Sequence, residues 1–188
     1  MQFILGSSSP RRLELLKSIG LNPDKVISPN IDETINKNEA PQEYVKRIAL
    51  SKMEALKREN IEGVILTADT IAFCGRRLID KTENPDTAIE NLKLLSGKRH
   101  KVITGLCIMD KDKKLITKSV ISIVQMQRLS EKEIKDYIKC NEWKNVAGSY
   151  RIQGKAESFI KFINGSYSNI VGLPLYETKN ILRSIGCI

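Results

Sequence analysis

Short apolar segments with strand character alternate along this chain with segments of helical periodicity. Residues 2–6 set the pattern, because they are apolar, are followed by three serines and lead to Pro10, which stands where a helix would begin. Alternation of this kind favours helices packed on a sheet. We therefore expect an α/β fold, with the 188 residues forming one domain over positions 1–188.

Two long apolar segments, 102–109 and 115–124, are joined by a polar turn at residues 110–113, which predicts a hairpin. Since a hairpin is antiparallel, we expect a mixed, strongly twisted sheet with flanking helices. Further strands are expected at residues 25–28, 63–74, 78–80, 149–152 and 158–163, with 63–74 interrupted at Asp69 and Thr70. Residues 164–174 are expected to form a glycine-rich loop.

Helix starts are marked by proline at the first helical position or by capping residues. Ser130 and Glu133 have capping-box spacing, in which each side chain binds the other residue's exposed amide. Helices are expected to begin at Pro10, Pro41 and Pro85, after Ser130, and at Leu175.

Composition excludes several classes of site. The four cysteines are scattered without a C-x-x-C pair, and His100 is the single histidine, so a zinc site is not expected. We interpret the cysteines as small buried side chains and His100 as a surface or strand-edge residue. No apolar segment approaches the roughly 20 residues of a membrane helix, and no signal-peptide pattern is visible, so we expect no membrane partner and a cytoplasmic location.

The net charge of +9 is spread over the whole chain, without a basic tail. Stable nucleic-acid binding is not expected, because such proteins more often concentrate their charge on one face or segment. Attraction for a small polyanion fits the same charge.

Ser7, Ser8 and Ser9 end the first strand, and Arg11 and Arg12 lie in the first turn of the helix that follows. Cations there oppose the helix dipole unless an anion is shared. Backbone amides, hydroxyls and guanidinium groups would together suit a phosphate. The alternative is a capped helix with two solvated arginines.

Acidic residues occur at two positions of interest. Asp69 stands in an apolar strand, where a carboxylate is costly unless a partner, a metal ion or a water molecule to be activated offsets its burial. It could instead cap a turn at the end of a strand. Asp32 and Glu33 follow each other on a loop; they are either solvated or complete an oxygen-ligand site with Asp69 for Mg²⁺ or Mn²⁺.

At this point the ordered motifs identify a resemblance to the Maf-type nucleoside triphosphate pyrophosphatases. The matching segments are Ile4–Arg12 with Glu14–Leu16, Ile31–Thr34, Tyr44–Val45 with Arg47, Ala49 and Lys52, Ala68–Thr70, Lys81, Leu95–Gly97 with His100, Val102, Thr104 and Gly105, Ala147–Gly148 with Tyr150 and Ile152–Gly154, and Asn164–Tyr167 with Val171–Leu175. They run in order through nearly the whole chain.

The resemblance implies a fold similar to that of the inosine triphosphate pyrophosphatases, with a nucleotide cleft between two lobes. It implies metal-dependent hydrolysis of dTTP and UTP to the monophosphate and pyrophosphate, with CTP and modified pyrimidine nucleotides as further candidates. It also implies Mg²⁺ or Mn²⁺ as cofactor and a homodimer.

The same resemblance suggests roles for individual residues. Asp69 would be the general base or a metal-linked carboxylate, and Glu33 would help to hold the metal. Phosphate contacts are expected from Ser8, Arg12, Lys52 and Lys81, and base specificity from Arg11, Thr70 and Gln153.

The sequence departs from the family at Thr82, where a proline is usual after Lys81, and at Arg151, where alanine is usual. Two alternatives therefore stay open: the 7-methyl-GTP subgroup of the family, and a non-catalytic nucleotide-binding regulator of septum formation.

Overall fold

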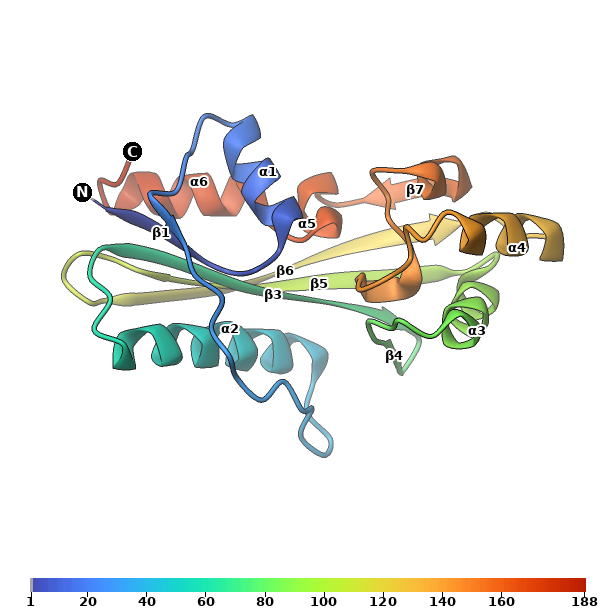
Figure 1. Ribbon diagram of the computed structural model, residues 1–188, viewed down its shortest axis with the longest axis horizontal. Coiled ribbons are helices and arrows are strands. Elements are labelled where there is room, and N and C mark those ends of the chain that lie inside the picture. Colours follow the sequence, from blue (N-terminus) through green and yellow to red (C-terminus); the bar gives the residue numbers. More distant parts are fainter. Residues whose placement is uncertain (1) are drawn as a thin grey trace. The chain divides into compact units, whose positions relative to one another are not determined.

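The fold is described from a computed structural model that covers residues 2–188 (Figure 1). The strands are β1 (Phe3–Gly6), β2 (Lys25–Val26), β3 (Val64–Cys74), β4 (Arg77–Ile79), β5 (Arg99–Met109), β6 (Leu115–Met126) and β7 (Ile160–Asn164). The helices are α1 (Pro10–Ser18), α2 (Pro41–Arg58), α3 (Pro85–Leu95), α4 (Glu131–Lys139), α5 (Tyr167–Val171) and α6 (Leu175–Ser184), with 3₁₀ turns η1 (Ala147–Ser149) and η2 (Lys155–Phe159).

Within the described residues the strands form a mixed sheet in the order β2-β1-β3-β5-β6-β7, with β4 paired to β3. β1 runs parallel to β2 and β3, whereas β4 and β7 run antiparallel to their neighbours. The chain divides into two compact units, which are described separately below. Unit 1 comprises Met1–Thr70, Thr104–Val120 and Gly172–Ile188, and unit 2 comprises Ile71–Ile103 and Ile121–Val171.

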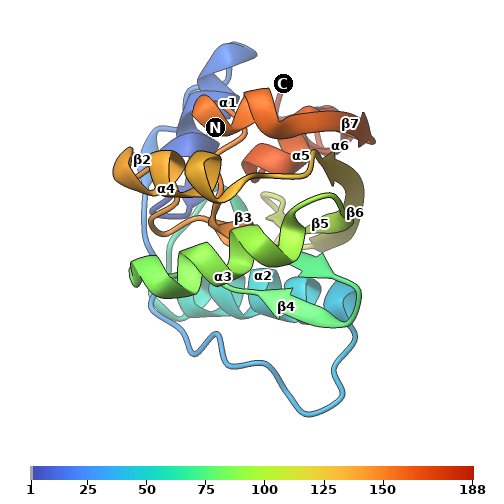
Figure 2. The ribbon, with the colours of Figure 1, turned by 90° about the vertical axis from the view of Figure 1, so that its right-hand side faces the viewer.

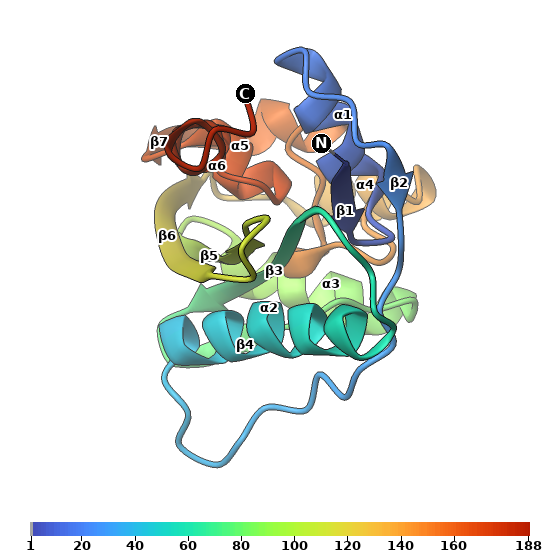
Figure 3. The ribbon, with the colours of Figure 1, turned by 90° about the vertical axis from the view of Figure 1, so that its left-hand side faces the viewer.

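Unit 1 places helices on both faces of its strands. The partners Ile4 and Ile65 are buried toward α2, and the next pair in register, Leu5 and Leu66, faces the opposite side because side chains alternate along a strand. Figures 1 and 3 show α2 on one side of β1 and β3, and α1 and α6 on the other.

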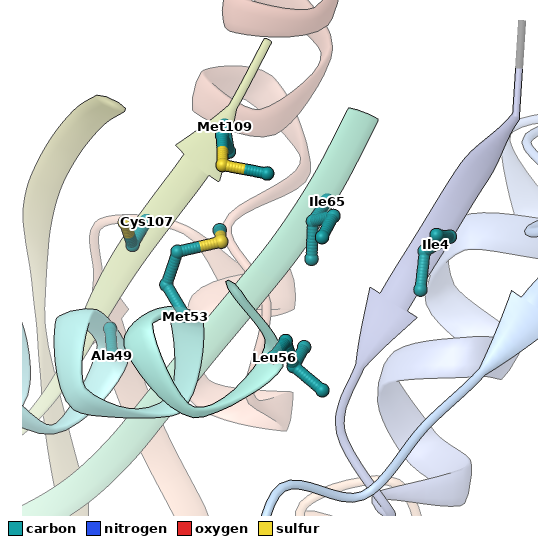
Figure 4. Close-up of a cluster of buried hydrophobic side chains, with 7 residues drawn as sticks. All are labelled: Ile4, Ala49, Met53, Leu56, Ile65, Cys107 and Met109. Carbon is teal, nitrogen blue, oxygen red and sulfur yellow. The ribbon is translucent and has the colours of Figure 1, made fainter. Parts of the chain in front are cut away.

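The core of unit 1 forms where α2 packs on the strands (Figure 4). Met53 and Leu56 of α2 are fully buried against side chains of β1, β3 and β5. α2 comes especially close at Gly105, where a Cβ atom would collide with the backbone of Val45. The missing side chain therefore fixes the distance of α2, and of Lys52 on it, from the sheet.

Unit 2 contains α3 and α4, which pack against each other (Figure 2). The expected capping box is present, with Ser130 and Glu133 bonded reciprocally, and Asn84 caps α3 by accepting hydrogen bonds from the amides of Asp86 and Thr87. All helices expected from the sequence are found, with starts at the predicted positions. None of the helices in residues 2–188 is long and apolar enough to cross a bilayer.

Several local predictions were wrong. β3 continues through Asp69 and Thr70 without a break, because both side chains find buried partners. No strand forms over residues 149–152; Gly148 and Ser149 have φ angles of 80° and 55°, which cannot continue an extended ladder. The loop expected over 164–174 contains the short helix α5.

His100 is buried in unit 2, contrary to the expectation of a surface or strand-edge position. It is 2% exposed, and its Nε2 lies 2.8 Å from the hydroxyl of Tyr150, which is buried too. Nearby in the same unit, the Asn91 amide donates to Ser149 Oγ. Burial lowers the pKa of His100 from 6.5 to about 4, so the imidazole is neutral in the folded protein at neutral pH.

We therefore predict that His100 makes the protein sensitive to mild acid. Because the folded-state pKa lies below the unfolded-state value, the contribution is complete above pH 6.5 and is lost as the pH falls toward 4. The total loss is up to about 3 kcal/mol. Urea unfolding between pH 7 and 4 measures it, since this is the chain's one histidine.

The matched control is the double variant His100→Phe with Tyr150→Phe, which removes the titrating ring and leaves no hydroxyl without its partner. Its unfolding free energy should change much less over the same pH interval. An equal decline in both proteins would contradict the assignment.

Candidate active site

Asp69 is a buried carboxylate paired with a buried ammonium group. It is 2% exposed in the middle of β3, and its Oδ1 lies 2.9 Å from Nζ of Lys52, which is itself 8% exposed on α2. Such a pair offsets the desolvation cost of each charge. The strand therefore carries a carboxylate without interruption because α2 supplies its counter-ion.

Glu33 completes this arrangement from the loop before α2. Its Oε1 lies 2.6 Å from the same Nζ of Lys52, so one ammonium joins two carboxylates from distant parts of the chain. The loop is tied to α2 by the Tyr44 hydroxyl, which donates to the carbonyl of Glu33, and by Arg47, which donates to the carbonyl of Thr34. The two acidic residues singled out from the sequence thus lie together.

Arg12 lies close to this pair and is almost fully buried, at 7% exposed. Its Nε donates to the carbonyl of Gly172 at 2.8 Å, Nη1 to Ser7 Oγ at 2.9 Å, and Nη2 to Thr70 Oγ1 at 3.1 Å. Burial lowers the pKa of Arg12, while the negative charges of Asp69 and Glu33 act in the opposite direction. Arg12, Lys52, Asp69 and Glu33 form the charged cluster of unit 1, in which two positive and two negative charges balance.

The remaining candidates of unit 1 surround the start of α1. Ser8 is exposed and Arg11 is half-buried, so both are accessible to a ligand. Ser9 occupies the N-cap position of α1, although its side chain makes no capping hydrogen bond. Thr70 is buried, and its hydroxyl lies 3.0 Å from that of Thr104.

Lys81 and Gln153 belong to unit 2. Lys81 is exposed directly after β4, where its amide donates to the carboxylate of Asp80. Gln153 is half-buried in the turn before η2, next to the buried Ile152. The structure thus brings together Arg12, Glu33, Lys52, Asp69 and Thr70 in unit 1, and describes Lys81 and Gln153 in the second unit.

The donors near Asp69 suit a hard metal ion only in part. Carboxylate oxygens are the ligands preferred by Mg²⁺ and Mn²⁺, and Glu33 and Asp69 supply them. Across residues 2–188, however, no group of three or more His, Cys, Asp or Glu side chains could hold a metal ion. A cation here would need further oxygen ligands from a phosphate or from water.

Ser7 and Gly172 hold Arg12 in place, and Thr104 contacts its partner Thr70; the sequence predicted none of these three contacts. Ser7 and Gly172 accept hydrogen bonds from Arg12, and Thr104 contacts the Thr70 hydroxyl. All three lie in motifs that matched the family, which was the available signal. The contacts at Gly172 and Thr104 join segments that are far apart in the sequence, whereas Ser7 lies close to Arg12 along the chain.

Comparison with solved structures places the fold. A HAM1 protein from Coxiella burnetii superposes with a TM-score of 0.55, at 13% identity, covering 98% of this chain and 99% of that one. The expected class, a mixed sheet with flanking helices, is confirmed by this likeness.

Comparison of sequences identifies the family of the chain. Residues 2–185 match the family described as Maf-like protein, so the chain belongs to the Maf family, as the motifs predicted.

Curated relatives cover nearly the whole chain. A dTTP/UTP pyrophosphatase of Zymomonas mobilis is 47% identical over 97% of this chain and 91% of its own length. A protein of the same name from Ruegeria sp. is 46% identical over 99% and 95%. A nucleoside triphosphate pyrophosphatase of Anaplasma marginale is 44% identical over 95% and 91%.

We predict that Lys52→Met destabilises the protein by about 3 kcal/mol, because it leaves the buried Asp69 without its counter-ion. Urea unfolding at pH 7 measures the change. The matched control is Lys57→Met on the same helix, where the pair with Glu54 is far less buried, with side chains 34% and 39% exposed, and should contribute less than about 0.5 kcal/mol. Equal changes in the free energy of unfolding for the two substitutions would show that the buried pair contributes no more to stability than the less buried one.

Proposed function

We propose that this protein hydrolyses dTTP and UTP to the monophosphate and pyrophosphate, with CTP and modified pyrimidine nucleotides as further substrates. Membership of the Maf family and the names of relatives at 46–47% identity support this proposal. The observation that carries it is the pair of carboxylates, Asp69 and Glu33, held on one ammonium beside a buried guanidinium. A simple polyanion binder has no use for two acids at that place.

The charge balance of the cluster supports a need for a divalent cation. Arg12 and Lys52 are already matched by Asp69 and Glu33, whereas a triphosphate brings about four further negative charges. We propose that Glu33 and Asp69 hold Mg²⁺ or Mn²⁺ together with phosphate oxygens. When bound, such a cation would neutralise charge on the phosphates and favour departure of pyrophosphate.

Lys52 would then change partners. Its ammonium contacts both carboxylates, and a cation shared by these carboxylates would release it. The released ammonium would pair with a phosphate oxygen, as a lysine point charge commonly does. Ser8, Arg12 and Lys81 are the further phosphate contacts in this proposal.

Asp69 is proposed as the general base. Its carboxylate would take a proton from a water molecule whose oxygen bonds to the α-phosphorus, while the bond from that phosphorus to the bridging oxygen breaks and pyrophosphate leaves. Arg11, Thr70 and Gln153 are proposed to set the base preference.

A cytoplasmic location and a homodimer are proposed with the same activity. The cysteines of residues 2–188 are all free, with Cys74 and Cys107 buried and the other two partly so, which suits a reducing compartment. Sedimentation at micromolar concentration measures the oligomeric state.

The test of the function is pyrophosphate release from a panel of dTTP, UTP, CTP, GTP and 7-methyl-GTP with Mg²⁺ or Mn²⁺, each repeated with excess chelator. We expect release from dTTP and UTP that chelator abolishes. We expect Asp69→Asn to remain folded and to retain less than about a tenth of the turnover, equivalent to a barrier increase above roughly 1.4 kcal/mol.

Glu62→Gln, an exposed carboxylate in the loop before β3, is the matched control and should keep full activity. Preference for 7-methyl-GTP would move the protein to the other subgroup, and binding without release from any triphosphate would favour a regulator. A residual rate above a tenth in Asp69→Asn would remove Asp69 from the base role.

We further predict that Gln153→Ala changes the ratio of kcat/KM among dTTP, UTP and CTP more than it changes the highest of these values, because an amide reads donor and acceptor groups on a base edge. Steady-state kinetics with the three nucleotides measure it. Lys155→Ala, an exposed neighbour in the same segment, should leave the ratio as it is. An unchanged preference in Gln153→Ala would exclude Gln153 from base recognition.

A further inference from the structure

Arg12 donates hydrogen bonds to three residues of unit 1 through one buried side chain. Its Nε, Nη1 and Nη2 donate in three directions, to the carbonyl of Gly172, to Ser7 Oγ and to Thr70 Oγ1. Three of its five N–H groups are therefore directed at protein acceptors. A lysine could not reproduce this planar fork, because its donors are carried by a single nitrogen atom.

Two of the three acceptors, Thr70 and Gly172, lie where the chain leaves and re-enters unit 1. The unit's first segment ends at Thr70, its second begins at Thr104, and its third begins at Gly172. Arg12 bonds directly to Thr70 and Gly172, and the Thr70 hydroxyl lies 3.0 Å from that of Thr104. One guanidinium thus links three boundary residues, which are far apart in the sequence.

The backbone at Gly172 is shaped around this contact. Its φ angle of 129° lies in a region that residues other than glycine rarely adopt. A Cβ atom there would lie 3.6 Å from Thr70 Oγ1 and 3.9 Å from Arg12 Nε. In this conformation the Gly172 carbonyl accepts from Arg12 at 2.8 Å and lies 3.3 Å from the Thr70 hydroxyl. The glycine therefore allows both bonds to one carbonyl.

Asp69 is the residue next to this network along β3. Because Thr70 is held from one side by Arg12 and contacts Thr104, the strand at Asp69 has little freedom to shift. The distance between Asp69 and Lys52 depends on that placement, since Lys52 comes from a different element. Loss of these hydrogen bonds would displace the Asp69 carboxylate without removing it.

We propose that Arg12 is a positioning residue for the reaction: by fixing Thr70, Thr104 and Gly172 at the boundaries of unit 1, it holds Asp69 in register with Lys52. This inference rests on the proposed function. It adds to the phosphate contact proposed for Arg12 a second role, in which the residue works through Thr70 and Gly172 before any nucleotide is bound.

A double-mutant cycle tests the proposal. We expect Arg12→Lys and Thr70→Val each to lower kcat at saturating dTTP about tenfold, whatever the change in KM, because Asp69 is displaced even when substrate is bound. The double variant should be no slower than the slower single variant, because both substitutions break one network. Thr70→Ser, which keeps the hydroxyl, should restore kcat to near the wild-type value.

Two kinetic outcomes would overturn the proposal. If the losses in kcat multiply, Arg12 and Thr70 act independently. If Arg12→Lys raises KM and leaves kcat unchanged, Arg12 acts only by binding the nucleotide. The control Arg58→Lys, an exposed arginine at the end of α2, should change neither parameter.

Amide hydrogen exchange without nucleotide gives an independent readout. We expect faster exchange in Arg12→Lys at Thr70, Thr104 and residues 172–173 together, and in Thr70→Val at the same places if Arg12→Lys does not fold. Acceleration confined to α1 would refute the network. If the wild-type chain hydrolyses neither dTTP nor UTP, the proposed function fails, while the exchange pattern still decides whether Arg12 fixes these boundary residues.

Discussion

The ammonium of Lys52 is the interaction on which the rest of the candidate site depends. It joins Glu33, from an exposed loop, to Asp69, from a fully buried strand, and so links the surface of unit 1 to its core. The ammonium can do this because α2 approaches the sheet closely at Gly105. Without the cation, a carboxylate at Asp69 would be buried with no opposite charge in contact, which costs several kcal/mol. The packing of α2 on the sheet and the pairing of charges at the site therefore depend on the same position of α2.

Two glycines show how the backbone, rather than side-chain chemistry, sets this geometry. Gly105 has an ordinary φ angle but stands against the Val45 backbone, so its requirement is steric. Gly172 has an unusual φ angle, so its requirement is conformational, and its carbonyl is thereby directed to Arg12. Charged residues of the cluster owe their positions to these two points, because a side chain would collide with the backbone at Gly105 and would strain the backbone at Gly172. Substitution at either would disturb the cluster without touching a charge.

The sequence predicted those features that depend on neighbours along the chain. Helix starts at Pro10 and Pro85 and the capping box at Ser130 were found because each depends only on residues within a few positions of the helix start. It could not show that β3 continues through Asp69, because Lys52 lies on another element, 17 residues away. The predicted strand over residues 149–152 does not form, and the positive φ angle at Ser149 likewise accompanies a contact with Asn91, which is far away along the chain.

For the candidate site, the residue types were predictable and their partners were not. Acidic residues in an apolar strand and in a loop indicated that Asp69 and Glu33 had a shared role, and the structure places them on one ammonium. The bonds from Arg12 span 58 residues to Thr70 and 160 residues to Gly172, beyond any local pattern. Family resemblance supplied candidates for roles, but only the folded chain shows what each side chain contacts.

The parallel strand β2 ends one side of the sheet with only two residues. An exposed sheet border is a template to which an unfolded or neighbouring chain can add its own strand, and the hazard grows with the length of the free border. Two residues offer very few unsatisfied amide and carbonyl groups for such addition. The brevity of β2 thus protects that border of unit 1 against self-association during folding and storage.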